Sequence, residues 1–262
     1  MPANQKVLFH STIFGPIHSR RLGTSLGINL SPNDGKVCSF DCIYCEAGYN
    51  SQGAGTTGFP SRESVKEQLE KKLIRMKEEG SGLDVITFSG NGEPTLHPDF
   101  PGIVEDTLAL RDKYYPEAKV SVLSNSTRLG KPEVDKALRM VDNNILKLDS
   151  AVEDTMRLID KPNQPDFTVE KVIDQLKGFG RDCIIQTMML RGSHEGQPVD
   201  NTTDAEIEAL AEAYKAIQPQ SVMLYSIDRS TPEENLKKVE REELEAIATR
   251  LHALTSLPIT VS

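Results

Sequence analysis

The sequence of 262 residues predicts an α/β protein built around a parallel sheet. Short apolar runs alternate with longer segments of helical periodicity, the order expected for parallel strands joined by right-handed crossovers. The apolar runs are continuous rather than alternating, as in strands that are buried on both faces. Polar and glycine-rich residues follow the runs, at the positions where such folds place their ligand sites.

Six strand–helix units are expected along the chain. Strands are predicted at residues 26–30, 84–89, 119–124, 145–150, 183–190 and 221–226, with a short terminal strand in PITVS at 258–262. Helices are predicted at 61–80, 100–115, 131–141, 151–160, 168–179, 202–217 and 239–254. Six units can form either an open doubly wound sheet or an incomplete barrel, and periodicity does not choose between them.

The first helix shows how these elements are identified. Ser61 can cap its N-terminus, and Gly80 stands where a left-handed residue often ends a helix. Apolar residues recur at spacings of three and four, at Val65, Leu69, Leu73 and Met76. No low-complexity linker divides the chain, so we expect one domain over residues 1–262, in which the C-terminal helix and terminal strand occupy 239–262.

The composition limits the classes of partner. The net charge is −9, whereas general nucleic-acid binders usually carry a basic excess, so we expect no DNA partner. No apolar run approaches the roughly 20 residues of a membrane span. The N-terminal stretch MPANQKVLFHSTIFG has no signal-peptide pattern, and a cytoplasmic location is therefore predicted.

Three of the four cysteines crowd into the loop 31–50, in the segment CSFDCIYC. Structural zinc is usually held by four ligands, but Cys38, Cys42 and Cys45 form a group of three, and Cys183 begins a distant predicted strand. Thiolates on such a loop can hold a 4Fe–4S cluster, and three of them leave one iron open for a ligand.

This segment resembles the signature of the radical S-adenosylmethionine (SAM) superfamily. The resemblance implies that the three cysteines bind one 4Fe–4S cluster, whose open iron is chelated by SAM, and that Tyr44 lies near the adenine. The segment SGNGEPT resembles the glycine-rich motif of the family, which implies that Gly90, Gly92 and Glu93 meet the amino group of SAM. It also implies a partial TIM-type (β/α)6 barrel.

Further polar residues at strand ends are candidate SAM contacts. By the family analogy Ser124 and Asn125 would contact SAM, and this role is favoured over the alternative of an Asx turn at the strand end. Asp149 could bind a ribose hydroxyl or cap the next helix. Gln186 has an amide that needs partners within an apolar strand, and Arg191 could pair with a carboxylate.

Other residues are candidate substrate contacts. Arg20 and Arg21 precede the first strand, and His97 follows the glycine-rich motif. Tyr225, Asp228 and Arg229 follow the sixth strand, where superfamily members often contact substrate.

The segments FGPIHSRRLGTSLGINLSP, TFSGNGEPTLHPDF and LDSAVEDTMRLIDKP are similar to the wyosine-synthase-like branch, whose enzymes modify a guanosine in tRNA. Those enzymes carry a second cysteine group upstream, whereas no cysteine here precedes Cys38, which implies a single cluster.

The resulting hypothesis is an enzyme that cleaves SAM reductively, with reduced flavodoxin or ferredoxin as the electron donor, and whose radical abstracts hydrogen from an unidentified substrate. A small molecule or peptide substrate is favoured over tRNA. The alternatives are tRNA-base modification of the wyosine type, activation of a glycyl-radical enzyme, and, in another class, a non-catalytic metal-binding module.

Overall fold

The computed structural model describes residues 6–19, 23–229 and 231–262. Within them one sheet runs in the order β1-β2-β3-β4-β5-β6-β8-β10, and the short strands β7 and β9 both pair with β6. From β2 to β10, each strand along this path is parallel to the next one. The path ends at β1 and β10 without closing, so the sheet forms a partial barrel.

The strands span Ile13–Ser19 (β1), Gly23–Ile28 (β2), Val85–Phe88 (β3), Lys119–Ser124 (β4), Asn143–Lys147 (β5), Ile184–His194 (β6), Gln197–Asp200 (β7), Ser221–Ser226 (β8), Leu236–Lys238 (β9) and Ile259–Val261 (β10). The helices span Arg62–Glu78 (α1), Phe100–Tyr114 (α2), Pro132–Met140 (α3), Glu153–Asp160 (α4), Val169–Phe179 (α5), Asp204–Ile217 (α6) and Arg241–Thr255 (α7).

The predicted α/β fold with six strand–helix units is confirmed, and so is the short terminal strand. Three strands were not expected from the sequence. β1 pairs antiparallel with β2, and β7 and β9 pair antiparallel with β6. The assignment of residues 1–262 to one domain stays a prediction.

Helix α1 forms as its sequence indicates. The Ser61 hydroxyl accepts a hydrogen bond of 3.2 Å from the Ser64 amide, and Gly80 beyond the helix has a φ of 68°, in the left-handed region. The predicted apolar stripe of α1 is buried, at Val65, Leu69, Leu73 and Met76.

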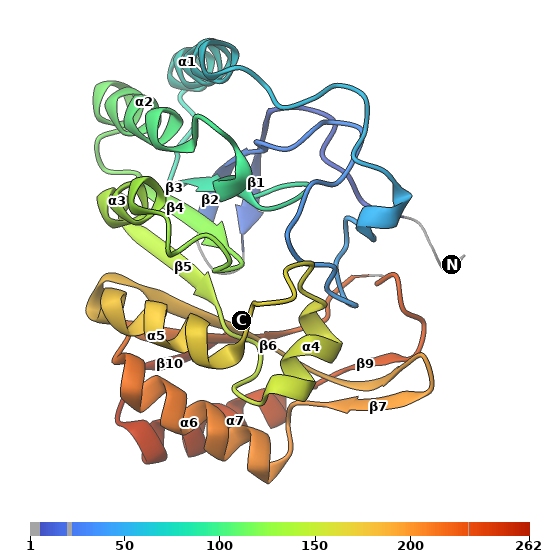
Figure 1. Ribbon diagram of the computed structural model, residues 1–262. Coiled ribbons are helices and arrows are strands. Elements are labelled where there is room, and N and C mark those ends of the chain that lie inside the picture. The colour runs from blue at the N-terminus through green and yellow to red at the C-terminus, as the bar shows by residue number, and fades with distance from the viewer. Residues whose placement is uncertain (1–5, 20–22, 230) are drawn as a thin grey trace.

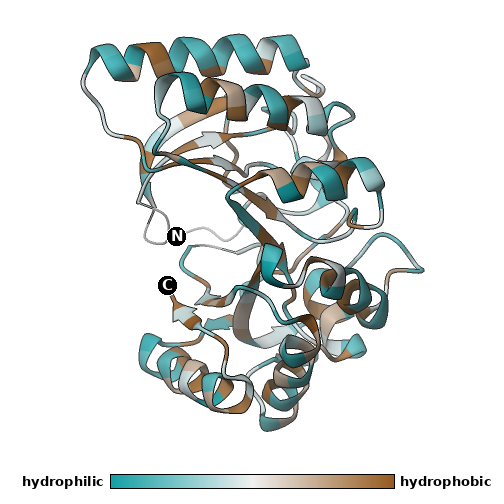
Figure 2. Cartoon of the chain, turned by 90° about the vertical axis from the view of Figure 1, so that its left-hand side faces the viewer, coloured by the Kyte–Doolittle hydropathy of each residue, from teal (hydrophilic) through white to brown (hydrophobic). Residues whose placement is uncertain are grey.

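The helices cover the outer side of the curved sheet. Figure 1 shows α1, α2 and α3 along strands β2–β5, and α5, α6 and α7 along the second part of the sheet. Figure 2 shows apolar colour along the strands and two-toned helices, as expected when one helix face packs on the sheet. None of the helices in the described ranges has the length and apolar character needed to cross a membrane.

Candidate functional site

The cysteine loop is joined to the glycine-rich turn after β3 by backbone hydrogen bonds. Val37 forms a parallel bridge with Gly92: the Val37 amide donates to the Asn91 carbonyl at 3.3 Å, and the Glu93 amide donates to the Val37 carbonyl at 3.1 Å. A Cβ atom on Gly92 would lie 1.9 Å from the Val37 carbonyl oxygen. Glycine is therefore required at position 92 so that the loop can approach this turn.

The other flank of the loop is held by the end of α4. The Ile43 amide donates to the Ile159 carbonyl at 2.9 Å, and the Asp41 amide donates to the Asp160 carbonyl at 3.0 Å. The Asn163 amide donates back to the Ser39 carbonyl at 3.0 Å. The loop is thus fixed on two sides by the fold around it.

All three cysteines of the loop are free thiols that line one cavity of about 160 Å³. The cavity lies at the carboxyl ends of β3, β4 and β5, beside β6. It is also lined by the predicted SAM contacts Tyr44, Gly90, Gly92, Glu93, Ser124, Asn125 and Gln186. Burial raises the pKa of the Cys38 thiol to about 12 and the pKa of Cys42 well above its ordinary value. Binding of a metal by these sulfurs therefore requires that it displace their protons.

The donor set fits an iron–sulfur cluster better than a single zinc ion. In the described part of the chain, no three His, Cys, Asp or Glu side chains are placed to hold one metal ion. A zinc site needs its ligands to converge on one ion, whereas a 4Fe–4S cluster distributes its thiolates over separate irons. Three soft sulfur donors around one cavity suit the latter group.

Glu93 is buried and joins the ends of β3 and β4. Its carboxylate accepts hydrogen bonds from the Ser124 hydroxyl at 2.9 Å and from the Asn125 amide at 2.6 Å. The Thr95 hydroxyl donates to the same carboxylate at 2.6 Å. The side-chain amide of Asn125 in turn donates to the Cys38 sulfur at 3.5 Å. Three predicted contact residues and one predicted ligand thus form one hydrogen-bonded group.

Tyr44 belongs to a second buried group, with Lys147 and Asp149. The Tyr44 hydroxyl donates to the Asp149 carboxylate and accepts from the Lys147 ammonium, which also donates to Asp149 at 3.0 Å. Asp149 accepts a further bond from the Met188 amide at 2.9 Å. Burial lowers the pKa of Lys147, but the neighbouring charges, that of Asp149 first, outweigh this effect and raise it well above its usual value.

Like Asp149, the predicted residues Arg191 and His97 do not line this cavity. Arg191 forms an ion pair with Glu243 of α7 and hydrogen bonds to Thr202. His97 donates from Nε2 to the Pro60 carbonyl at 2.8 Å and accepts from the Asp99 amide at 3.1 Å. His97 therefore ties the segment before α1 to the turn before α2.

The predicted substrate contacts after β8 line a second cavity of about 320 Å³, which includes Tyr225, Asp228 and Arg229. Tyr44 lines this cavity as well as the one that holds the thiols, so the two adjoin at its side chain. Arg229 also forms an ion pair with Glu46, at 2.8 Å. The predicted contacts Arg20 and Arg21 lie outside the described residues.

Sequence reasoning missed several residues of this region. Lys36 and Lys147 line the thiol cavity, and His18 lines the second one. Asp160 lies buried below the loop and accepts a hydrogen bond from the Cys42 thiol at 3.5 Å. For Lys36, its place two residues before Cys38 was an available signal, but the others are brought to the site only by the fold.

Comparison with known proteins places the chain in a family. A family model described as the radical SAM superfamily matches residues 33–205. A protein of Brachyspira hyodysenteriae named GTPase Obg is 31% identical over 95% of this chain, which spans 35% of that protein. The present sequence contains no G-x-x-x-x-G-K-[ST] motif, and that name is not carried over to it.

Proteins named UPF0026 are similar over most of the chain. The one from Synechocystis is 30% identical, over 84% of this chain and 77% of its own length. The one from Methanocaldococcus jannaschii is 32% identical, and the chain spans 66% of it.

Solved structures share the fold at low identity. A radical SAM methyltransferase from Sphaerobacter thermophilus has a TM-score of 0.66 at 16% identity, over 91% of this chain and 65% of that one. TYW1 with a lysine–pyruvate adduct has a TM-score of 0.60 at 16% identity, over 89% of this chain and 75% of that one. The family model covers more than half of the chain, and the chain therefore belongs to the radical SAM superfamily.

Proposed function

We propose that this protein is an enzyme that binds one 4Fe–4S cluster through Cys38, Cys42 and Cys45 and uses it to cleave SAM. The observation that carries the proposal is the single cavity in which the three free thiols meet the glycine-rich turn, the end of β4 and Gln186 of β6. Such a cluster would supply one electron to the sulfonium group, giving methionine and a 5′-deoxyadenosyl radical that abstracts a hydrogen atom from the substrate.

The residues around the cavity would bind and orient SAM. Glu93 would accept hydrogen bonds from its ammonium group, in addition to the bonds it already accepts within the protein. Ser124, Asn125 and Gln186 would contribute polar contacts at the strand ends, and Asp149 would hold the ring of Tyr44 through its hydroxyl. Gly90 and Gly92 would leave room for the ligand beside the turn.

We further propose that the substrate binds in the adjoining cavity, near Tyr225, Asp228 and Arg229. The volume of about 320 Å³ favours a small molecule or the side chain of a peptide over a bulky RNA loop. The net charge of −9 also disfavours tRNA. Reduced flavodoxin or ferredoxin would donate the electron, and a reducing cytoplasm would keep the thiols available.

Anaerobic reconstitution with iron and sulfide tests the proposal. We expect about four irons per chain and a brown chromophore. After reduction in the presence of SAM, we expect methionine and 5′-deoxyadenosine as products. A protein loaded with the cluster that never cleaves SAM would contradict the enzymatic proposal and favour a non-catalytic metal-binding module.

The ligand assignment has a matched control within the chain. Cys42→Ala should lose the intact cluster and the cleavage of SAM. Cys183→Ala removes another buried thiol, whose sulfur donates a hydrogen bond to the Gly180 carbonyl, and should retain both. If the two variants behave alike, the assignment of Cys42 is wrong.

A further inference from the structure

Lys36 is a buried cation within the cysteine loop. The residue is 4% exposed, and its ammonium donates to the Gly48 carbonyl at 2.7 Å and to the Asp41 carboxylate at 3.2 Å. Lysines are rarely buried to this extent unless their charge is compensated. Lys36 lines the same cavity as the three thiols, so its charge lies next to their sulfurs.

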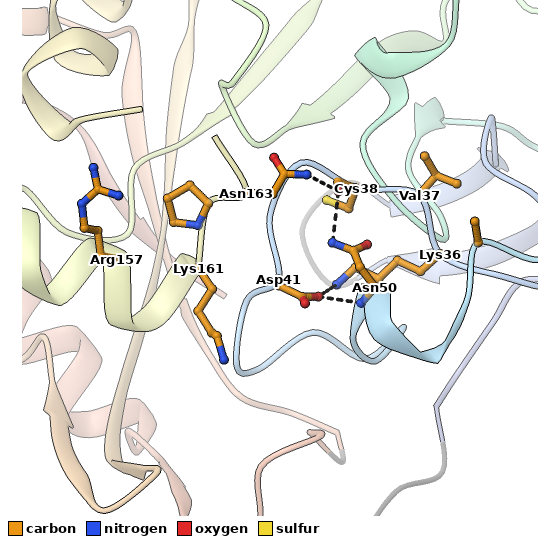
Figure 3. Close-up of a pocket in the computed structure, with 10 residues that line it drawn as sticks. Lys36, Val37, Cys38, Asp41, Asn50, Arg157, Lys161 and Asn163 are labelled. Atoms are coloured by element: carbon orange, nitrogen blue, oxygen red, sulfur yellow. Dashed lines mark hydrogen bonds and ion pairs between the residues drawn. The ribbon is translucent and has the colours of Figure 1, made fainter. Parts of the chain in front are cut away.

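Lys36 and Cys38 also line a second hollow, on the outer side of the loop. This outer pocket of about 680 Å³ is shown in Figure 3, where Lys36, Asp41, Asn50 and Cys38 lie together. Lys36 and Cys38 are the residues that the linings of the outer pocket and the thiol cavity have in common. They therefore form part of the wall between solvent and the thiols.

The charge of Lys36 is only partly balanced on the side of the thiols. Asp41 lines the outer pocket but not the thiol cavity, and its side chain is 25% exposed, against 3% for Lys36. Solvent screens the carboxylate more than the ammonium, so Asp41 does not cancel the positive potential that Lys36 contributes inside the cavity.

Lys147, the other lysine of the cavity lining, has a different environment. Its ammonium lies 3.0 Å from the Asp149 carboxylate and 3.9 Å from the carboxylate of Asp160. The Asp149 carboxylate is fully buried beside the ammonium, so the charge of Lys147 is balanced inside the protein. Lys36 therefore differs from Lys147, because the carboxylate that pairs with Lys36 is partly exposed to solvent.

We propose that Lys36 is a positioning residue that raises the reduction potential of the cluster held by this loop, an inference that rests on the proposed function. When a flavin or iron–sulfur carrier is oxidised by one electron, the cluster is reduced by one electron and its net negative charge increases by one. A fixed buried cation stabilises the more negative state. Lys36 would thereby favour arrival of the electron that cleavage of SAM requires.

A redox titration of the reconstituted protein, followed by the paramagnetic signal of the reduced cluster, tests this inference. Lys36→Met removes the charge and keeps the length of the side chain. At the midpoint potential of the wild type, we expect the ratio of reduced to oxidised cluster to fall about tenfold, which corresponds to 59 mV for one electron. Lys36→Arg, which keeps the charge, should restore most of that ratio.

Asp41→Asn changes the charge near the cluster in the opposite direction to Lys36→Met, within the same hydrogen-bonded pair. It removes the carboxylate charge and keeps an oxygen that can accept from the Asn50 amide, so the ratio should rise above that of the wild type. Lys77→Met, on the exposed surface of α1, is the matched control and should leave the ratio unchanged.

The opposite changes in the ratio expected for Lys36→Met and Asp41→Asn distinguish an effect of charge from an effect of a loosened loop. Shifts of Lys36→Met and Asp41→Asn in the same direction, or no shift in either, would overturn the inference. If Lys36→Met fails to assemble a cluster, a raised ratio in Asp41→Asn supports the inference and an unchanged ratio overturns it. A wild-type protein that takes up no cluster would instead overturn the proposed function, and this inference with it.

Discussion

At the scale of single residues, the glycine-rich turn is defined by contacts with the protein itself. Gly92 approaches the Val37 carbonyl, and Gly90, with a φ of 148°, faces the Asn29 side chain, where a Cβ would lie 2.4 Å from an oxygen. The glycines of this motif are therefore needed for the cysteine loop to pack against the end of β3, independently of any ligand that binds at the turn.

Gly92→Ala should destabilise the protein. The added methyl would overlap a backbone oxygen, which cannot rotate away, and overpacking of this kind costs about 1–3 kcal/mol. Gly178→Ala is the matched control, since no atom lies within 4 Å of its Cβ position, and alanine in a helix gains up to about 1 kcal/mol over glycine. Urea unfolding should place the two midpoints on opposite sides of the wild type. A midpoint of Gly92→Ala at or above that of the wild type would contradict the packing argument.

The cysteines could be identified from the sequence because their spacing is local. The partners around them could not, because Lys147 and Asp160 are more than one hundred residues from Tyr44 and Cys42 in the sequence. In the sequence, a polar residue near the end of a strand or helix is most simply interpreted as solvent-exposed. Only the packing of β5 and α4 against the loop shows that Lys147 and Asp160 are not.

At the scale of elements, helices and parallel strands were predictable where their apolar periodicity is strong. The missed strands lack this signal. β1 has a register shift between Phe14 and Ile17 and contains Pro16, while β7 and β9 are short and mostly polar. Such edge segments are selected by pairing with β2 or β6 and not by their own composition.

Helix α1 offers a test of the predicted stripe. Leu69 is 1% exposed, and Leu69→Ala should cost about 2–5 kcal/mol through loss of burial and creation of a cavity. Ile74 on the same helix is 37% exposed, and Ile74→Ala should change stability by no more than about 0.5 kcal/mol. Equal losses in thermal or urea unfolding would show that α1 does not pack as described.

At the scale of the whole molecule, the thiol cavity joins distant parts of the chain. Its lining comes from the cysteine loop, the turn after β3, the end of β4, and strands β5 and β6. A ligand in this cavity would contact residues from several strands of the open sheet at once. Its binding would therefore stabilise the folded protein against global unfolding.

SAM should therefore stabilise the reconstituted protein. At a concentration one hundred times its Kd, a ligand specific for the folded state adds about 2.7 kcal/mol to the free energy of unfolding. Anaerobic unfolding with and without SAM measures this gain, and the iron-free protein should gain less, because it lacks the open iron. An equal gain in both forms would argue against binding of SAM to the cluster.

The bridge between Val37 and Gly92 also bears on how the protein matures. It extends the pairing pattern of the sheet into the cysteine loop, and the end of α4 holds the opposite flank. In zinc fingers, by contrast, the peptide is unfolded until the metal binds. Here we expect the polypeptide to fold and arrange the thiols before any metal binds. The cluster would then be inserted into a preformed site, either by transfer from a scaffold protein or by assembly from free iron and sulfide.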